Sequence, residues 1–205
     1  MDLIKNLFKG KIKLIFKKPP NTDILIFDDT SFEDLKFFIE KKNYFLLPTR
    51  QDRIKIIYIN LKFFINFVKL FMFQQNKRGL FLTAYFVSII ETIKPKVVVS
   101  HIDNSIKYSD VSFFLKDKFK FLTIQNASRY DALINHLNFE KNLKDKLDNY
   151  KLFIQNYCCL GQWEIDCYTN LKHQVDHFHK IGSIRKSNFF RYLEREEKKL
   201  NPNLF

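Results

Sequence analysis

The segment from Lys96 to Asn126 constrains the fold more strongly than any other part of the sequence. It begins with an apolar β-branched run, VVVS (97–100), continues through an amphipathic stretch and ends in a second apolar run, FLTI (121–124). This pattern predicts a strand, a helix and a second strand. A connection of this length joins parallel strands, almost always as a right-handed crossover. The carboxyl ends of both strands are therefore expected at the same edge of one sheet.

A polar cluster, His101, Asp103, Asn104 and Ser105, follows the first of these strands. Open α/β sheets bind ligands at their carboxyl edge, so the cluster can hydrogen-bond a polyhydroxylated ligand. Asp103 is a candidate general base, and His101 can act as acid or base or orient a carboxylate. The alternative is structural, because Asp, Asn and Ser are preferred helix caps and a histidine at a buried strand end is commonly packed and satisfied. From the residues alone we favour the cap.

A second polar cluster follows the second strand, where Gln125 and Asn126 are succeeded by Arg129. The two amides can hold a hydroxyl group, and Arg129 can bind a carboxylate or phosphate through its planar fork. An Asx-type turn explains the same residues equally well.

Two glycines are placed where a strand is expected to lead into a helix: Gly161 with Glu164, and Gly182 with Ser183 and Arg185. Backbone amides at such helix N-termini can hold an anion. A tight turn that needs glycine for its backbone angles is the simpler interpretation of each one taken singly. Two such turns at the same sheet edge favour a binding site somewhat more.

Apolar runs alternate with helical patterns over residues 21–205. This predicts one α/β domain, a Rossmann-like, doubly wound, mainly parallel sheet with helices on both faces. Residues 1–20 are expected to form a basic amphipathic lead-in, and residues 127–150 a loop with a short helix. The pattern leaves open whether the chain begins strand, helix, strand, strand or strand, helix, strand, helix. Further strands are predicted at 24–27, 44–48, 54–59, 151–161 and 177–182, and helices at 30–42, 60–75, 79–93, 162–171 and 183–200.

The sequence lacks the motifs that bind common nucleotide cofactors and metals. Neither GxGxxG nor GxxxxGK[ST] occurs, so no glycine-dependent nucleotide site is expected. The segment HQVDHFH (173–179) places His173 and His177 four residues apart, but no HExxH or Cys/His framework surrounds it, and we expect no metal. The three cysteines, without a CxxC and without a secretory signal before the fold, predict buried free thiols in a reducing cytoplasm.

The formal net charge is +13, which favours an anionic partner. Nucleic acid is not expected, because no RNP, zinc-finger or helix-turn-helix pattern accompanies the basic runs. Peripheral contact with an anionic membrane surface is the preferred expectation, since Phe8, Ile12, Leu14 and Phe16 interleave with lysines. No segment is expected to span a membrane, and the charge-free run 79–90 predicts a buried helix.

The succession IKPKVVVSHIDNS, FLTIQN with Arg129, CCLGQWEIDCY and IGSIR resembles the bacterial surface carbohydrate biosynthesis proteins, a family similar to GT-B glycosyltransferases. The resemblance begins near ILIFDD (24–29) and covers nearly the whole chain, but Ala127 stands where the family usually has glycine. It implies the N-terminal, acceptor-side half of a two-domain enzyme of capsule or lipopolysaccharide synthesis. The nucleotide-sugar donor is then expected on a C-terminal half, and this chain alone is expected to lack full activity.

The resemblance implies a cytoplasmic protein that contacts the inner face of the plasma membrane and a glycan or glycolipid acceptor. The family provides no catalytic residue to transfer, so the roles are a hypothesis from the residues themselves: Asp103 or His101 accepts the acceptor's proton, while Asn104, Gln125, Asn126 and Arg129 position the ligand. Two alternatives stay open: a non-catalytic module that binds a glycan or a membrane surface, and half of a sugar-nucleotide epimerase.

Overall fold

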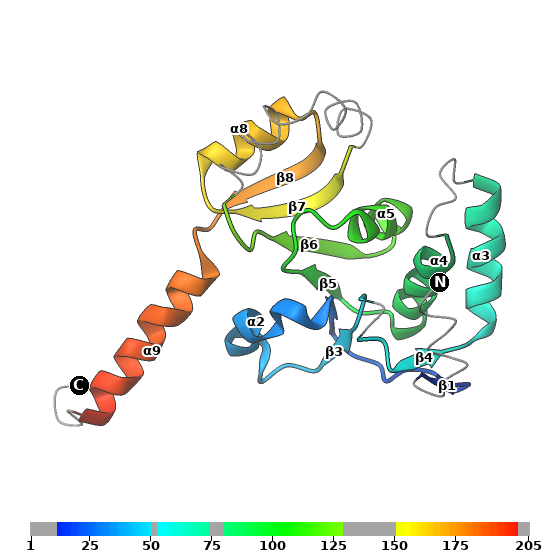
Figure 1. The fold of residues 1–205 in the computed structure, drawn as a ribbon, viewed down its shortest axis with the longest axis horizontal. Coiled ribbons are helices and arrows are strands. Elements are labelled where there is room, and N and C mark those ends of the chain that lie inside the picture. Colours follow the sequence, from blue (N-terminus) through cyan, green and yellow to red (C-terminus); the bar gives the residue numbers. More distant parts are fainter. Residues whose placement is uncertain (1–11, 51–52, 74–79, 129–150, 201–205) are drawn as a thin grey trace.

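The computed structural model describes residues 12–50, 53–73, 80–128 and 151–200. Its centre is a six-stranded sheet in which every neighbouring pair of strands is parallel (Figure 1). The strands, in chain order, are β2 Ile24–Phe27, β3 Tyr44–Leu47, β5 Val97–Ser100, β6 Lys120–Ile124, β7 Phe153–Cys159 and β8 Gln174–Lys180. They lie side by side in the order β3-β2-β5-β6-β7-β8.

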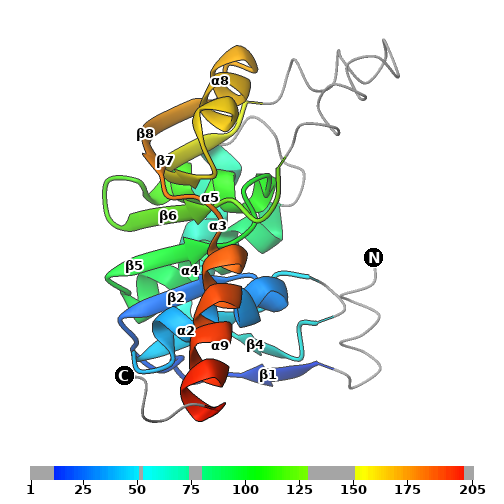
Figure 2. The same ribbon diagram turned by 90° about the vertical axis from the view of Figure 1, so that its left-hand side faces the viewer.

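Helices cover both faces of this sheet. They are α2 Phe32–Ile39, α3 Leu61–Phe73, α4 Leu80–Ile93, α5 Ile106–Leu115, α8 Gln162–Asn170 and α9 Ile184–Leu200. On one face, Leu25 and Phe121 belong to the hydrophobic core that includes α4 and α5, and on the other face Ile26 and Val99 pack with α2. Figure 2 shows α2 and α9 in front of the strands and α3 and α4 behind them. The predicted Rossmann-like α/β fold is confirmed.

The order of the strands reverses between β2 and β5. From β2 the chain moves outward to β3, then crosses back to β5 on the other side of β2, and every later strand is added beyond β5. In doubly wound sheets the ligand crevice lies outside the carboxyl ends of the strands at this switch point. A ligand site is therefore expected at the residues that follow β2 and β5.

The helix α4 is the most completely buried helix that the structure describes. Every residue from Thr83 to Ile90 is buried, which confirms the buried helix predicted from the charge-free run. Its polar side chains are satisfied locally, since the Ser88 hydroxyl donates to the Ala84 carbonyl at 2.6 Å and the Thr92 hydroxyl to the Ser88 carbonyl at 2.7 Å. These bonds remove the cost of burying hydroxyl groups in an apolar core.

Two short strands form a separate sheet beside the main one. The strands β1 Lys13–Ile15 and β4 Ile56–Tyr58 pair in parallel. The strand predicted at 54–59 therefore exists but lies outside the main sheet, and its partner comes from the lead-in at 1–20. Ile12, just before β1, is buried in the main hydrophobic core. This part of the lead-in thus belongs to the folded domain.

The last strand begins earlier than predicted, at residue 174 and not 177. The strand β8 is at the edge of the sheet and most of its side chains are exposed, so no apolar run marks its start. The loop predicted at 127–150 lies outside the described residues beyond Ser128. No helix in the described ranges is both long enough and apolar enough to cross a membrane.

Candidate functional site

His101 lies at the switch point, where the chain leaves β5. Its side chain is only 2% exposed, and Nδ1 lies 3.4 Å from Oδ2 of Asp34 in α2 without hydrogen-bond geometry. Burial is the largest influence and lowers the pKa of His101; Arg185 lowers it further, and Asp34, Asp103 and the Gln125 backbone raise it without reversing the shift. His101 is therefore neutral at pH 7 and can serve as a proton acceptor or donor.

Asp34 links His101 to the helix α9. Arg185 Nε, in the first turn of α9, donates to Asp34 Oδ2 at 2.8 Å, and Asn188 Nδ2 donates to the Asp34 carbonyl at 2.8 Å. The Asp34 side chain is 24% exposed, and that of Arg185 is 53% exposed. The three side chains of His101, Asp34 and Arg185 form a partly open polar cluster, which we call the switch-point triad. Asp34 was not among the predicted site residues.

Asp103 is 3% exposed and lies beneath α8. Its Oδ2 accepts hydrogen bonds from the hydroxyl of Tyr157 in β7 at 3.2 Å and from that of Tyr168 in α8 at 2.9 Å. Burial, then the neighbouring Tyr168 and Asp103, raise the pKa of Tyr157 far above its usual value, so its hydroxyl stays protonated and donates. In this arrangement Asp103 ties β5 to β7 and α8.

Of the other two members of the first polar cluster, one caps a helix and the other is exposed to solvent. Ser105 is the N-cap of α5, and its hydroxyl accepts a hydrogen bond from the Tyr108 backbone amide at 3.2 Å. The structural alternative predicted for this cluster therefore holds for Ser105. Asn104 is exposed at the same edge, where its amide can reach a ligand.

The second predicted cluster joins two strand ends. Gln125 is buried, its Nε2 donates to the Ala127 carbonyl at 2.9 Å, and its Oε1 accepts from the Leu160 amide at 3.0 Å. These bonds fix the loops after β6 and β7 to one another. Asn126 is half-buried beside them. Arg129 lies outside the described residues.

The two glycine turns differ in their backbone requirements. Gly182 has a φ of 74°, a conformation that glycine adopts without strain, so the turn interpretation applies there. Gly161 is extended, and a Cβ at this position would meet only Glu164 Oε2, at an ordinary 3.8 Å. Glu164 is buried in the first turn of α8. At the start of α9, the Ser183 hydroxyl accepts a hydrogen bond from the Lys186 backbone amide at 3.3 Å and caps the helix.

A second acidic group missed by the sequence interpretation follows β2. Asp28 has a φ of 80°, which is rare for residues other than glycine. Its carboxylate accepts hydrogen bonds from the Thr30 amide and hydroxyl and, at 2.8 Å, from the Thr49 hydroxyl, while Arg50 Nε lies 3.7 Å away. Burial raises the pKa of Asp28, but these partners outweigh it and leave the pKa below its usual value. Strained backbone held by several contacts is common at functional sites.

The thiols and the histidine-rich segment offer no alternative centre. Burial raises the pKa of Cys158, Cys159 and Cys167, so little thiolate forms at neutral pH. His177 projects from the edge strand β8, whereas His173 precedes it, so they do not share a helix face. Within the described residues, no group of three or more His, Cys, Asp or Glu side chains could hold a metal ion.

His173 makes the fold sensitive to acid. Burial and the Lys151 charge lower the pKa of His173 to about 4, against an ordinary value of 6.5, and its Nδ1 accepts the Leu152 amide at 3.3 Å. Because the folded state binds fewer protons than the unfolded state, stability present above pH 6.5 is lost as the pH falls toward 4. In His173→Asn, whose oxygen can still accept the amide, we expect a smaller loss of unfolding free energy between these pH values.

Urea unfolding at several pH values measures this effect. The matched control is His177→Asn on the exposed face of β8, which should keep the wild-type pH dependence. An unchanged slope in His173→Asn would show that other groups cause the acid sensitivity.

Comparisons with protein-family models, with curated proteins and with solved structures found no match. A functional assignment for this chain therefore rests on its own residues: a Rossmann-like sheet, a switch-point triad at its carboxyl edge, and the exposed Asn104 beside it.

Proposed function

We propose that the carboxyl edge of the six-stranded sheet binds a hydroxyl-rich ligand, a glycan or glycolipid acceptor. The observation that carries this proposal is the switch-point triad: a carboxylate held between a buried neutral histidine and an arginine where the strand order reverses. Asp34 is open enough to accept a hydrogen bond from a sugar hydroxyl, and Arg185 can donate to a sugar oxygen or a phosphate. The Nδ1 of His101 is buried 3.4 Å from Asp34 Oδ2, where it can support the carboxylate.

In the wider role that we propose, the chain is the acceptor-side half of a cytoplasmic glycosyltransferase-like enzyme of bacterial surface polysaccharide synthesis. Deprotonating the acceptor hydroxyl is the chemistry that half must supply, and a carboxylate supported by a neutral histidine is suited to it. Asp34 is better placed than Asp103 for this step, because Asp103 is buried with two tyrosine hydroxyls already on one oxygen. The nucleotide sugar would be held by a separate half.

Binding measurements on this chain test the proposal. A glycan array identifies candidate acceptors, and calorimetry with the best glycan and with nucleotide sugars gives affinities. We expect glycan binding and weak or no binding of the nucleotide sugar alone. Arg185→Gln should weaken glycan binding by about tenfold, because it removes a charged hydrogen-bond donor at the site. Lys96→Gln, an exposed cation whose Asp23 partner lies at the amino edge, is the matched control and should bind normally.

Two outcomes would redirect the assignment. Binding of the nucleotide sugar without any glycan would favour the epimerase-like alternative. Glycan binding that is insensitive to Arg185→Gln would place the ligand away from the switch-point triad.

A further inference from the structure

The helix α3 is apolar on both sides, and only one side is buried. Phe63 and Leu70 pack into the main core against α4, and the Phe63 ring lies 5.0 Å from that of Phe81. The opposite side carries six large apolar residues that recur every three or four positions and are between 46 and 75% exposed. We call this surface the outer α3 face; it consists of Leu61, Phe64, Ile65, Val68, Phe71 and Met72.

Solvent-exposed apolar residues are usually scattered, and a contiguous row of them marks an interaction surface. A helix with one apolar face and lysines beside it is suited to lie in a membrane interface. The 13 residues of α3 rise about 20 Å, too short for the roughly 30 Å hydrocarbon core of a bilayer. The geometry is that of a helix lying flat on a surface and burying one side in it.

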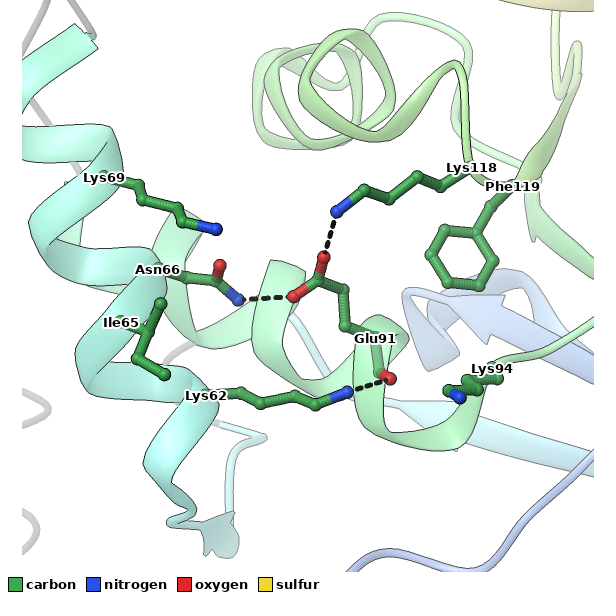
Figure 3. A pocket seen from close by; sticks show the side chains of 8 residues that line it. All are labelled: Lys62, Ile65, Asn66, Lys69, Glu91, Lys94, Lys118 and Phe119. Atoms are coloured by element: carbon green, nitrogen blue, oxygen red, sulfur yellow. Dashed lines mark hydrogen bonds and ion pairs between the residues drawn. The ribbon is translucent and has the colours of Figure 1, made fainter.

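Lysines flank the outer α3 face on one side. Lys62 and Lys69 project from α3 into a cavity of about 540 Å³ that Lys94 and Lys118 also line (Figure 3). The acid in this cavity, Glu91, is already engaged: its carboxylate accepts from Lys118 Nζ at 2.7 Å and from Asn66 Nδ2 at 2.9 Å. The α3 sequence contains no Asp or Glu. The surroundings of the apolar face are therefore cationic.

Lys62 Nζ donates to the Glu91 carbonyl at 2.8 Å, which leaves Lys69 as the lysine of α3 that can meet a phosphate. From this combination we propose that the outer α3 face docks onto an anionic phospholipid bilayer, with its apolar side chains at the level of the acyl-chain boundary and Lys69 at the phosphates. Apolar area and lysine attraction are the two contributions that bind interfacial helices to anionic lipid. A second copy of the chain fits less well, because a symmetric contact through α3 would bring the lysines of both copies together with no acid on either helix. The proposal is independent of the ligand at the carboxyl edge.

Vesicle co-sedimentation tests it with the whole chain. We expect binding to phosphatidylcholine vesicles that contain phosphatidylglycerol, weaker binding to phosphatidylcholine alone, and loss of the difference at high salt, where the Debye length falls from about 10 Å at 0.1 M to about 3 Å at 1 M. The double variant Phe64→Ser, Met72→Ser should weaken partitioning at least about tenfold. Phe189→Ser on α9, where the phenylalanine is similarly exposed, is the control and should bind as wild type.

A separate variant measures how much lysine charge contributes to vesicle binding. No hydrogen bond or ion pair of Lys69 is found among the described residues, so Lys69→Gln should leave the fold intact and weaken binding to anionic vesicles about fivefold, with no effect on neutral ones. Lys41→Gln, in the turn after α2, is its control. Melting curves establish that each variant is folded.

Two results would overturn the proposal. One is vesicle binding that survives both the double variant and Lys69→Gln. The other is a concentration-dependent dimer that the double variant dissociates, with no vesicle binding by the wild type; the outer α3 face would then be a self-association surface.

Discussion

Tyr108→Ala is expected to lower the free energy of unfolding by about 4 kcal/mol, because it removes a buried aromatic ring from the middle of the core. The ring of Tyr108, in α5, lies edge-on to Phe27 of β2 at 5.2 Å and to Phe121 of β6 at 5.7 Å. Its hydroxyl donates to the Val98 carbonyl of β5 at 2.9 Å and lies 3.0 Å from the Leu122 carbonyl. One side chain thus holds three neighbouring strands of the sheet.

Tyr108→Phe separates the ring from the hydroxyl. It keeps the aromatic packing and loses the hydrogen bonds, so a smaller loss of about 1–2 kcal/mol is expected. Thermal melts and urea titrations measure both variants. In a chain of this size a loss of 4 kcal/mol corresponds to a fall in Tm of roughly 8–16 °C. Equal losses in the two variants would mean that the hydroxyl, and not the ring, accounts for the stabilisation.

The secondary structure of the central unit was predictable because its signals are local. The β-branched run at 97–100 and the apolar run at 121–124 are strands in the structure, with β6 beginning one residue earlier. Ser105 caps the helix between them, as its residue type suggests. The pairing of β4 with β1 was not predictable in this way. Both are three-residue strands, and their pairing depends on contacts across about 40 residues of chain.

The candidate site was only partly predictable, for the same reason. Strand-end positions locate the carboxyl edge, so His101 and Gln125 were found from the pattern. Asp34 was not, because an acid in the first turn of a helix is explained by the helix dipole alone. Its contact with Arg185 spans 151 residues and exists only because α9 folds back against α2. No local sequence pattern predicts this contact between α9 and α2.

Asp103→Ala is expected to destabilise the protein by about 3 kcal/mol even without any ligand. The change leaves the hydroxyls of Tyr157 and Tyr168 buried without the carboxylate oxygen that accepts both. A buried hydrogen bond to a charged group contributes about 1.5–3 kcal/mol. Asp103→Asn, which keeps an oxygen acceptor, is the matched control and should lose about half as much. Urea unfolding of the free protein measures both.

A double-mutant cycle then decides whether Asp103 serves the fold or a ligand. Tyr168→Phe removes one donor, so combining it with Asp103→Ala should cost clearly less than the sum of the single changes, because both delete the same hydrogen bond. If the Asp103→Ala protein were instead as stable as wild type and had lost glycan binding, the carboxylate would be a ligand-binding or catalytic group. Coupling to Tyr168 together with retained glycan binding would support the proposal that Asp34, beside His101 in the switch-point triad, and not Asp103, accepts the proton.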